Sequence, residues 1–218
     1  MKILDSTMFR YESEMIPVLI DNLSKVFKTE YIATEFSTGN GVADLVFTTE
    51  MNDEDLFLND YALMSLFVSL FQQNKHITTK QLQKSNLDKN KLKKLLIQLE
   101  VNDFIEYDGE VIKRNRKYKA HTRNLLSVEA KLNDWKSGFY QALRYKFFSH
   151  QSYLAYPEKN IHRVDLDLLK EHNIGLISVG DDKIRFISKP KTEKPKDLTS
   201  YFFLSELFAQ QFKTMQAI

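Results

Sequence analysis

The sequence predicts an α/β protein in which a mixed β-sheet is flanked by helices and a small helical module is inserted between two strands. Three observations lead to this prediction. A helical apolar repeat near the start precedes two alternating strands, strands and helices alternate again after residue 124, and the segment between has its own helical periodicity. With 218 residues, 43% of them hydrophobic, the chain is long enough for one medium core and an accessory module.

The first part of the sheet domain is predicted within residues 1–57. A helix over about residues 12–28 has an apolar face formed by Ile16, Leu19, Ile20, Leu23, Val26 and Phe27. Pro17 is tolerated there because the first helical turn does not need its missing N–H. Strands over about 31–37 and 42–49 follow, joined by a Thr-Gly-Asn-Gly segment that suits a tight turn.

The second part of the sheet domain is predicted within residues 121–188. The pattern there predicts two helices and four strands: helices over 134–149 and 165–172, and strands over 125–131, 152–156, 175–179 and 183–188. Together with the first part, these segments predict a mixed sheet with helices beside it.

The last predicted region, residues 189–218, has two parts. Residues 189–196 mix prolines with alternating charges, which predicts an extended and solvated linker. Residues 197–215 resume an apolar helical pattern that is rich in phenylalanine. Because so many aromatic side chains do not stay exposed, we expect this helix to complete the core or to form a homodimer contact.

The inserted module, residues 58–120, has the pattern of a winged helix. Asp60 is placed to cap a helix through about Gln73, a short helix begins near Thr78, and Asn86 or Asp88 is placed to cap a third helix. Two short strands around an Asp-Gly turn follow over about 104–112. Winged helices bind DNA, and they also serve as protein-interaction or dimerisation modules, so both uses remain open.

Positive charge is concentrated in this module. Residues 75–123 contain 13 Lys and Arg against 6 Asp and Glu, a net of +7 in a chain whose total is +2. Such a segment predicts contacts with the phosphates of double-stranded DNA, with modest sequence preference because lysines read bases poorly. The predicted contacts are Lys89, Asn90, Lys91, Lys93 and Lys94 in the third helix, and Lys113, Arg114, Arg116, Lys117, Lys119 and Arg123 after it.

A candidate metal site comes from the strand period. Glu129 and Lys131 are two positions apart and therefore share one face of their predicted strand, while Val128 and Ala130 point into apolar packing. Asp44 is the polar residue of a second alternating strand. If the two strands are neighbours, two carboxylates can hold Mg²⁺ or Mn²⁺ beside the lysine, which suits phosphodiester hydrolysis.

The order of these elements resembles the PD-(D/E)xK superfamily of restriction-endonuclease-like nucleases, over residues 10–50 and 124–187. The resemblance implies that Asp44 and Glu129 coordinate the metal and that Lys131 activates the attacking water. It also implies further roles: the Ala130 carbonyl and Glu14 as additional ligands, and Gln141 and Tyr145 as supporting residues on the next helix.

The chain departs from that family pattern in two ways. Ala43 stands where the family has proline, which removes no ligand. The larger departure is that Glu129 lies 85 positions after Asp44, where the family joins the two strands by a short hairpin. The inserted winged-helix module accounts for this distance.

Several other functions are disfavoured by composition. The chain has no cysteine, so thiolate catalysis and cysteine zinc sites are excluded, and its five histidines lack zinc-hydrolase spacing. Its six glycines form no phosphate-binding loop of the ATPase or dinucleotide type. No run of about 18 apolar residues and no signal-peptide pattern is present, so we expect a cytoplasmic location.

These observations predict a metal-dependent DNA endonuclease, a hydrolase whose winged helix holds the duplex while Asp44, Glu129 and Lys131 cleave it. Two alternatives share the same elements. One is a non-catalytic DNA-binding regulator that keeps the nuclease scaffold, and the other is an antiphage or mobile-element accessory protein that requires a partner subunit.

Overall fold

The computed structural model describes residues 9–84 and 87–216, so the predicted cap Asn86 lies outside the described residues. The chain divides into two compact units. Unit 1 comprises Met1–Glu50 and Arg123–Lys196, and unit 2 comprises Met51–Thr122 and Asp197–Ile218.

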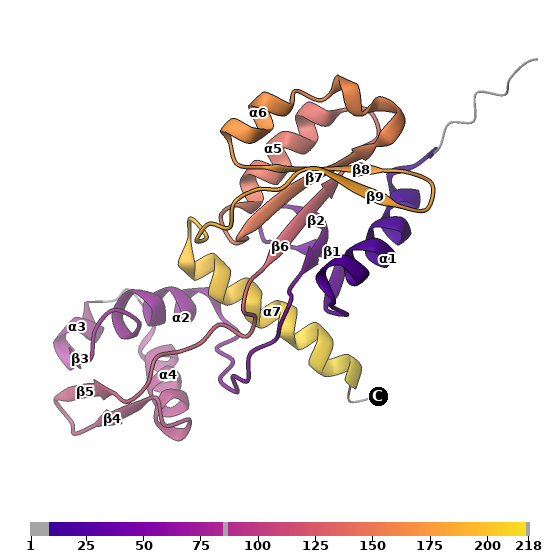
Figure 1. Ribbon diagram of the computed structural model, residues 1–218. Helices are drawn as coiled ribbons and strands as arrows, with labels where there is room; N and C mark the ends of the chain where they lie inside the picture. Colours follow the sequence, from indigo (N-terminus) through magenta and orange to yellow (C-terminus); the bar gives the residue numbers. More distant parts are fainter. Residues whose placement is uncertain (1–8, 85–86, 217–218) are drawn as a thin grey trace, which may run out of the picture. The chain divides into compact units, whose positions relative to one another are not determined.

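Unit 1 is built on a six-stranded sheet whose described strands have the order β1-β2-β6-β7-β8-β9 (Figure 1). The central pairs β6–β7 and β7–β8 are parallel and the other pairs are antiparallel, which makes the sheet mixed, as predicted. The strands are β1 (Ile32–Ser37), β2 (Val42–Phe47), β6 (Leu126–Ala130), β7 (Gln151–Pro157), β8 (Gly175–Val179) and β9 (Ile184–Ser188).

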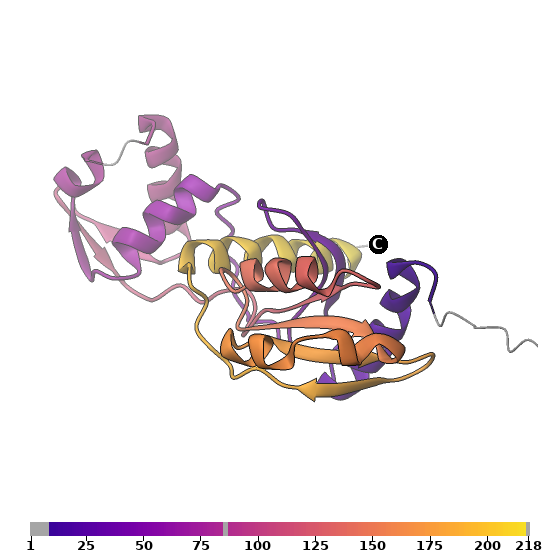
Figure 2. The same ribbon diagram turned by 90° about the horizontal axis from the view of Figure 1, so that it is seen from above.

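Helices cover both faces of this sheet (Figures 1 and 2). Helix α1 (Met15–Phe27), preceded by the 3₁₀ turn η1 (Glu12–Glu14), packs its Leu19 and Leu23 on one face. The other face is covered by α5 (Trp135–Tyr145) and α6 (Leu166–Glu171), and the 3₁₀ segment η3 (Glu158–Arg163) follows β7. Strand alternation assigns each residue of β6 and β7 to the α1 face or the α5 face.

Aspartates define where α5 and α6 begin. The side chain of Asp134 accepts a hydrogen bond from the backbone N–H of Ser137, and Asp165 does the same for Leu168. Each satisfies an N–H that the helix itself leaves without a partner. The start of α5 is thereby fixed just after β6, which places the helix over the polar residues of that strand.

Unit 2 contains helices and a three-stranded sheet with the order β3-β5-β4. Asp60 and Asp88 cap α2 and α4, as predicted, but the predicted first helix is α-helical only to Leu66 and continues as a π-helical segment, η2. Strand β3 was not predicted. The elements are α2 (Tyr61–Leu66), η2 (Phe67–Phe71), β3 (His76–Thr78), α3 (Thr79–Gln83), α4 (Lys89–Val101), β4 (Ile105–Tyr107), β5 (Val111–Arg114) and α7 (Leu198–Gln216).

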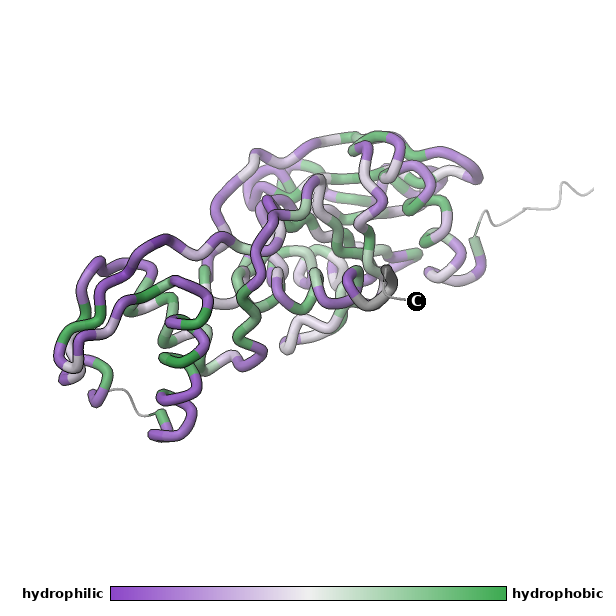
Figure 3. Tube along the Cα trace, turned by 90° about the horizontal axis from the view of Figure 1, so that it is seen from below, coloured by the Kyte–Doolittle hydropathy of each residue, from purple (hydrophilic) through white to green (hydrophobic). Residues whose placement is uncertain are grey.

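Each unit has hydrophobic residues of its own to bury. Figure 3 shows hydrophobic stretches in both units, separated by hydrophilic ones. In unit 2 the residues buried most completely include Met64, Phe71, Leu95 and Leu99. Helix α7 belongs to unit 2, where its Ser205 accepts a hydrogen bond from the backbone N–H of Thr122. The phenylalanine-rich helix therefore completes the core of the inserted unit.

The segment 189–196 is extended, as predicted, but it is not solvated throughout. Pro190 and Pro195 are buried. The backbone N–H of Lys191 donates to the side-chain oxygen of Asn173 at 2.7 Å, and that of Glu193 donates to the His150 carbonyl at 3.0 Å. The prediction of a fully solvated linker is wrong because these backbone groups find partners on unit 1.

None of the described helices combines the length and the apolar composition that crossing a membrane would require.

Candidate functional site

Asp44 and Glu129 lie on neighbouring strands of unit 1. Strands β2 and β6 pair antiparallel, and Leu45 is the register partner of Val128. One step further along this register, Asp44 lies opposite Glu129, and opposite residues of an antiparallel pair share one face of the sheet. The backbone N–H of Ala130 donates to Asp44 Oδ2 at 2.7 Å. Two carboxylates separated by 85 positions in the sequence therefore meet on the α5 face.

Lys131 completes this group from the end of β6. Its ammonium lies 2.7 Å from Glu129 Oε1, and only 15% of the lysine side chain and 1% of the glutamate side chain are exposed. The stem of the lysine passes close to α5 at Gly138, where an added Cβ would lie 2.7 Å from Lys131 Cγ. A glycine at this position lets the lysine lie flat against the helix.

A third carboxylate comes from the start of the first helix, and it is Glu12, where the sequence predicted Glu14. Glu12 Oε2 lies 3.4 Å from the Lys131 ammonium, and its Oε1 accepts a hydrogen bond from the backbone N–H of Leu132 at 3.2 Å. The carboxylate of Glu14 turns back to accept the backbone N–H of Arg10 at 2.6 Å. The structure thus engages Glu14 in capping η1 and brings Glu12 to the site.

The two predicted supporting residues on α5 have different surroundings. The Tyr145 hydroxyl lies 2.7 Å from Glu129 Oε2 and 2.8 Å from the Val42 carbonyl, so it links the glutamate to β2. Gln141 is half-buried, and its side-chain oxygen lies 3.4 Å from the hydroxyl of Ser137 within the same helix. Of the pair, Tyr145 is the residue that contacts the acidic group.

Burial and charge perturb the titration of this group. Burial raises the pKa of Asp44 above its usual value, although the Ala130 N–H and Lys131 oppose this. Burial also raises the pKa of Glu129, and the nearby charge of Asp44 adds to the effect. Burial alone lowers the pKa of Lys131, but its hydrogen bond to Glu129 and the surrounding carboxylates outweigh burial and raise it. The lysine is therefore held as a cation between carboxylates.

Burial, together with the charge of Glu129, raises the pKa of Tyr145 far above its usual value. The hydroxyl keeps its proton near neutral pH, and its one O–H is shared between Glu129 Oε2 and the Val42 carbonyl.

Glu35, on β1, is a residue that the sequence patterns did not single out. The β1–β2 register places it opposite Asp44, between the pairs Thr34–Leu45 and Phe36–Ala43. Its charge contributes to the raised pKa of Asp44. Its φ of 47° is unusual for a residue other than glycine and costs of order 1–3 kcal/mol. Strand periodicity alone gives no signal for such a backbone conformation.

The donor chemistry of this group suits a hard divalent cation. Asp44, Glu129 and Glu12 offer carboxylate oxygens, which are the ligands that Mg²⁺ and Mn²⁺ prefer. Among the described residues, however, no three Asp, Glu, His or Cys side chains lie close enough together to hold one metal ion. The Lys131 ammonium provides the positive charge between Glu129 and Glu12.

The predicted DNA-contacting residues of α4 are exposed. Lys89, Asn90, Lys93 and Lys94 all face solvent. Lys91 is exposed too, but its ammonium forms an ion pair with Asp60 at 2.7 Å. The start of α4 therefore carries four exposed lysines among the predicted DNA-contacting residues: Lys89, Lys91, Lys93 and Lys94.

The basic segment after α4 does not form one continuous phosphate-binding stripe. Arg114 donates to the carbonyls of Phe71 and Gln72, and Arg116 pairs at 3.0 Å with the buried carboxylate of Glu54. These arginines turn toward the protein because buried acceptors need donors. Two further cations form exposed ion pairs, Lys113 with Glu106 and Arg123 with Glu50, and Lys117 and Lys119 are exposed.

Arg123 also lies in unit 1, whereas the other residues of the segment lie in unit 2.

No protein-family model and no curated protein sequence matches this chain. Among solved structures, the chain is similar to the SPO1766 protein of unknown function from Silicibacter pomeroyi, with 10% sequence identity and a TM-score of 0.31. The match covers 43% of this chain and 62% of that protein. A likeness of this degree carries no argument about fold family or function.

Proposed function

We propose that the protein is a divalent-metal-dependent nuclease that hydrolyses phosphodiester bonds in double-stranded DNA. One observation carries the proposal: Asp44 and Glu129 meet on one face of the sheet, beside the largely buried side chain of Lys131. Carboxylates that share a site repel one another, and their burial is costly unless a cation stabilises them. A lysine and a divalent cation together meet that requirement.

The residues of the site have separate tasks in this proposal. Asp44, Glu129 and Glu12 supply oxygen ligands, and Tyr145 orients Glu129 through its hydroxyl. Lys131 positions the attacking water and stabilises negative charge that develops on the phosphate. Bound Mg²⁺ would supply further positive charge for the scissile phosphate. The Ala130 carbonyl remains a proposed additional ligand.

The order of elements in unit 1 supports a restriction-endonuclease-like assignment. Helix α1 is followed by the hairpin β1–β2, then by β6 with Glu129, by α5 with Tyr145 and by the parallel strand β7. This is the succession on which the family resemblance rests. The insertion between β2 and β6 explains the long separation of Asp44 from Glu129.

The order of elements in unit 2 supports a winged-helix assignment. Before α7, the described order is helix, short strand, short helix, longer helix and a two-stranded hairpin, with the three strands joined in one sheet. We propose that the exposed cations at the start of α4 contact DNA phosphates. Because lysine dominates this surface, the expected contribution is affinity with modest sequence preference.

Cleavage assays test the nuclease proposal. Purified protein is incubated with plasmid, linear and branched DNA in Mg²⁺, Mn²⁺ or EDTA. We expect cleavage with metal and none with EDTA. We expect Asp44→Ala and Lys131→Ala to reduce cleavage by at least about a hundredfold. Asp21→Ala, which changes an exposed ion pair on α1, is the matched control and should cleave normally.

DNA binding should be largely retained in both site variants. Undiminished Mg²⁺-dependent cleavage by either purified variant would show that the assigned residues are not the site.

A second candidate function is a DNA-binding regulator without catalytic turnover. The observation that favours it is the position of the Lys131 ammonium, 2.7 Å from Glu129 and 3.4 Å from Glu12, where it stabilises both carboxylates. Binding of DNA with no cleavage under any metal condition would support this candidate and reject the nuclease.

A further inference from the structure

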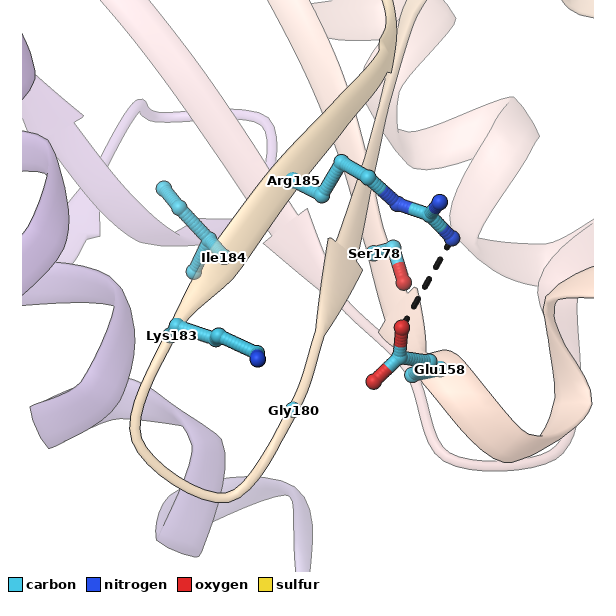
Figure 4. Close-up of a pocket in the computed structure, with 6 residues that line it drawn as sticks. All are labelled: Glu158, Ser178, Gly180, Lys183, Ile184 and Arg185. Carbon is cyan, nitrogen blue, oxygen red and sulfur yellow. Dashed lines mark ion pairs between the residues drawn. The ribbon is translucent and has the colours of Figure 1, made fainter.

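A recess lies in unit 1, where β8 turns into β9 (Figure 4). Its volume is about 380 Å³. The residues that line it come from the start of η3, the end of β8, the turn and the start of β9: Glu158, Ser178, Gly180, Lys183, Ile184 and Arg185. None of these residues belongs to the site described above.

Sheet register relates this recess to Lys131. Ala130 pairs with Ala155, so the next position places Lys131 level with Tyr156; Tyr156 pairs with Ser178, and Ser178 pairs with Arg185. Strand alternation puts these positions on the α5 face, since Ile177 and Val179 pack on the α1 side. Lys131, Ser178 and Arg185 therefore belong to one row across the sheet.

The spacing of this row can be estimated from the distance of about 4.8 Å between neighbouring strands. Ser178 lies two strands from Lys131, or roughly 10 Å, and Arg185 lies three strands away, or roughly 14 Å. Phosphates of one DNA strand follow one another about every 3.4 Å along the duplex axis, so a duplex whose axis runs along this row presents about three or four phosphates over this distance.

The charge of the recess favours an anion. Its lining carries two cations, Lys183 and Arg185, and one carboxylate, Glu158, while Asp181 and Asp182 of the same turn are exposed and are not among the lining residues. The Arg185–Glu158 pair is 3.6 Å apart with 65% and 44% of the side chains exposed, so it is weak and water can replace it. The backbone N–H of Gly180 donates to the Lys183 carbonyl at 2.8 Å and closes the turn. Figure 4 shows the Lys183 side chain extending from this turn toward the recess.

We propose that this recess binds a backbone phosphate of the DNA strand whose neighbouring segment occupies the Asp44, Glu129 and Lys131 site. The proposal rests on the nuclease function proposed above. Arg185 and Lys183 provide the charge, and the Ser178 hydroxyl provides a hydrogen bond. The side chain of Tyr156 fills the row between the two sites, and its hydroxyl donates to the Asn133 carbonyl. The bound DNA strand therefore follows the rim of the β-sheet.

Binding of a fluorescein-labelled DNA duplex, measured by anisotropy over a range of NaCl concentrations with Ca²⁺ in place of Mg²⁺, tests this proposal. We expect the double variant Lys183→Ala, Arg185→Ala to bind about tenfold more weakly near 0.1 M salt. The slope of log affinity against log salt should become shallower by about one for each phosphate that the variant no longer neutralises. Lys189→Ala is the matched control, because it removes a cation just past the other end of β9, over the Phe186 ring.

The substitution Glu158→Gln should change DNA affinity in the opposite direction. Removing this carboxylate leaves Arg185 available to phosphate, so the variant should bind DNA more tightly than the unchanged protein. Far-ultraviolet circular dichroism checks that each variant is folded. Unchanged affinity and slope in the folded double variant would overturn the proposal.

Neutral methylphosphonate linkages locate the contact. In the unchanged protein, one such linkage three or four positions from the cleavage point should weaken binding, and in the double variant it should have no further effect. Inorganic phosphate provides the other arm: if it perturbs the Lys183 and Arg185 signals at low millimolar concentration while no linkage matters, the recess binds free phosphate and the proposal fails.

The two proposals fail in distinguishable ways. Absence of cleavage, together with weaker and less salt-dependent DNA binding by the double variant, would reject the nuclease and keep a phosphate contact. Normal cleavage, with DNA binding unaffected by the double substitution and by the methylphosphonate linkages, would reject only the proposed phosphate contact.

Discussion

The acidic group of unit 1 shows how a few side chains make a buried charge tolerable. Glu129 is almost fully buried, yet one of its oxygens faces the Lys131 ammonium and the other faces the Tyr145 hydroxyl. Removing one partner of such an arrangement leaves a buried charge without compensation, which costs several kcal/mol. The arrangement therefore depends on the position of the lysine stem.

Gly138→Ala tests that dependence. A Cβ at this position would lie 2.6 Å from Leu154 Cδ1 and 2.7 Å from Lys131 Cγ, so both side chains, or the helix itself, must move. Alanine favours a helix by about 1 kcal/mol over glycine, but overpacking costs about 1–3 kcal/mol. We expect a lower stability in urea unfolding and, because Lys131 is displaced, a changed pH profile of cleavage.

Lys136→Ala, in the same helix but exposed, is the control for this substitution. Equal stability and equal pH profiles for the two variants would show that the glycine does not position the lysine.

At the residue scale, the sequence predicted that Asp44, Glu129 and Lys131 share one face of the sheet, but near the first helix it named Glu14, whereas Glu12 is the glutamate that contacts Lys131. Strand alternation was sufficient for Asp44, Glu129 and Lys131, because a period of two fixes which residues share a face. Glu12 and Glu14 are only two positions apart, and their roles depend on where the helix begins. Sequence patterns locate helix ends to within a few residues only.

Among the elements, α7 has the clearest structural role. The carboxylate of Glu206 is buried and accepts the backbone N–H groups of Leu58 and Asn59, and it also lies 3.0 Å from the Tyr118 hydroxyl. Helix α7 thereby holds the segment that leads into α2. Burial raises the pKa of Glu206 above its usual value, although these hydrogen bonds oppose the shift.

Glu206→Ala should destabilise unit 2. The substitution leaves two backbone N–H groups without an acceptor, and each buried unsatisfied group costs about 1–3 kcal/mol. We expect a lower midpoint for the urea unfolding of unit 2, measured by the chemical shifts of its residues in two-dimensional NMR. Gln211→Ala, at an exposed position of the same helix, should leave the stability of the unit within about 0.5 kcal/mol of its original value.

A midpoint equal to that of the Gln211 variant would mean that Glu206 does not stabilise the unit.

The sequence predicted elements with strong periodicity and missed those that depend on distant partners. All six strands of the large sheet were predicted with ends within two residues. Strand β3 has only three residues and exists because it pairs with β5, in which Lys113 is the partner of His76. Similarly, the burial of Pro190 depends on tertiary partners and has no local signal.

For the whole molecule, metal binding should depend on pH in a way that reflects burial of the site. Asp44 and Glu129 have pKa values raised above their ordinary values of 3.8 and 4.5. Carboxylates must be ionised to bind Mg²⁺, so protons compete with the metal as the pH falls. We expect the midpoint for loss of Mg²⁺ affinity, measured by calorimetry, to lie above those ordinary values.

The stability of the metal-free protein should respond in the opposite direction. Because the folded state holds these two protons more tightly than the unfolded chain, their contribution to stability decreases as the pH rises through the folded pKa values. Glu129→Gln should reduce this loss. A Mg²⁺ affinity that stays constant down to the ordinary carboxyl values would contradict the assignment of both residues.

The sequence predicted the inserted module, but it did not predict that helix α7 belongs to the same unit as that module. The interrupted strand order and the change in charge indicated a separate module between Asp44 and Glu129. The contacts of Glu206 with Leu58 and Asn59 span 148 and 147 positions, and a sequence pattern contains no information on such a pairing.

The chain passes between its two units at three places, after Glu50, Thr122 and Lys196. During synthesis on the ribosome, β2 is therefore made long before β6, its neighbour in the sheet, and residues 51–122 emerge before the helix that covers them. Each unit therefore lacks part of its fold until its second segment has been synthesised. A chain truncated after Lys196 contains every segment of unit 1 but lacks helix α7 of unit 2.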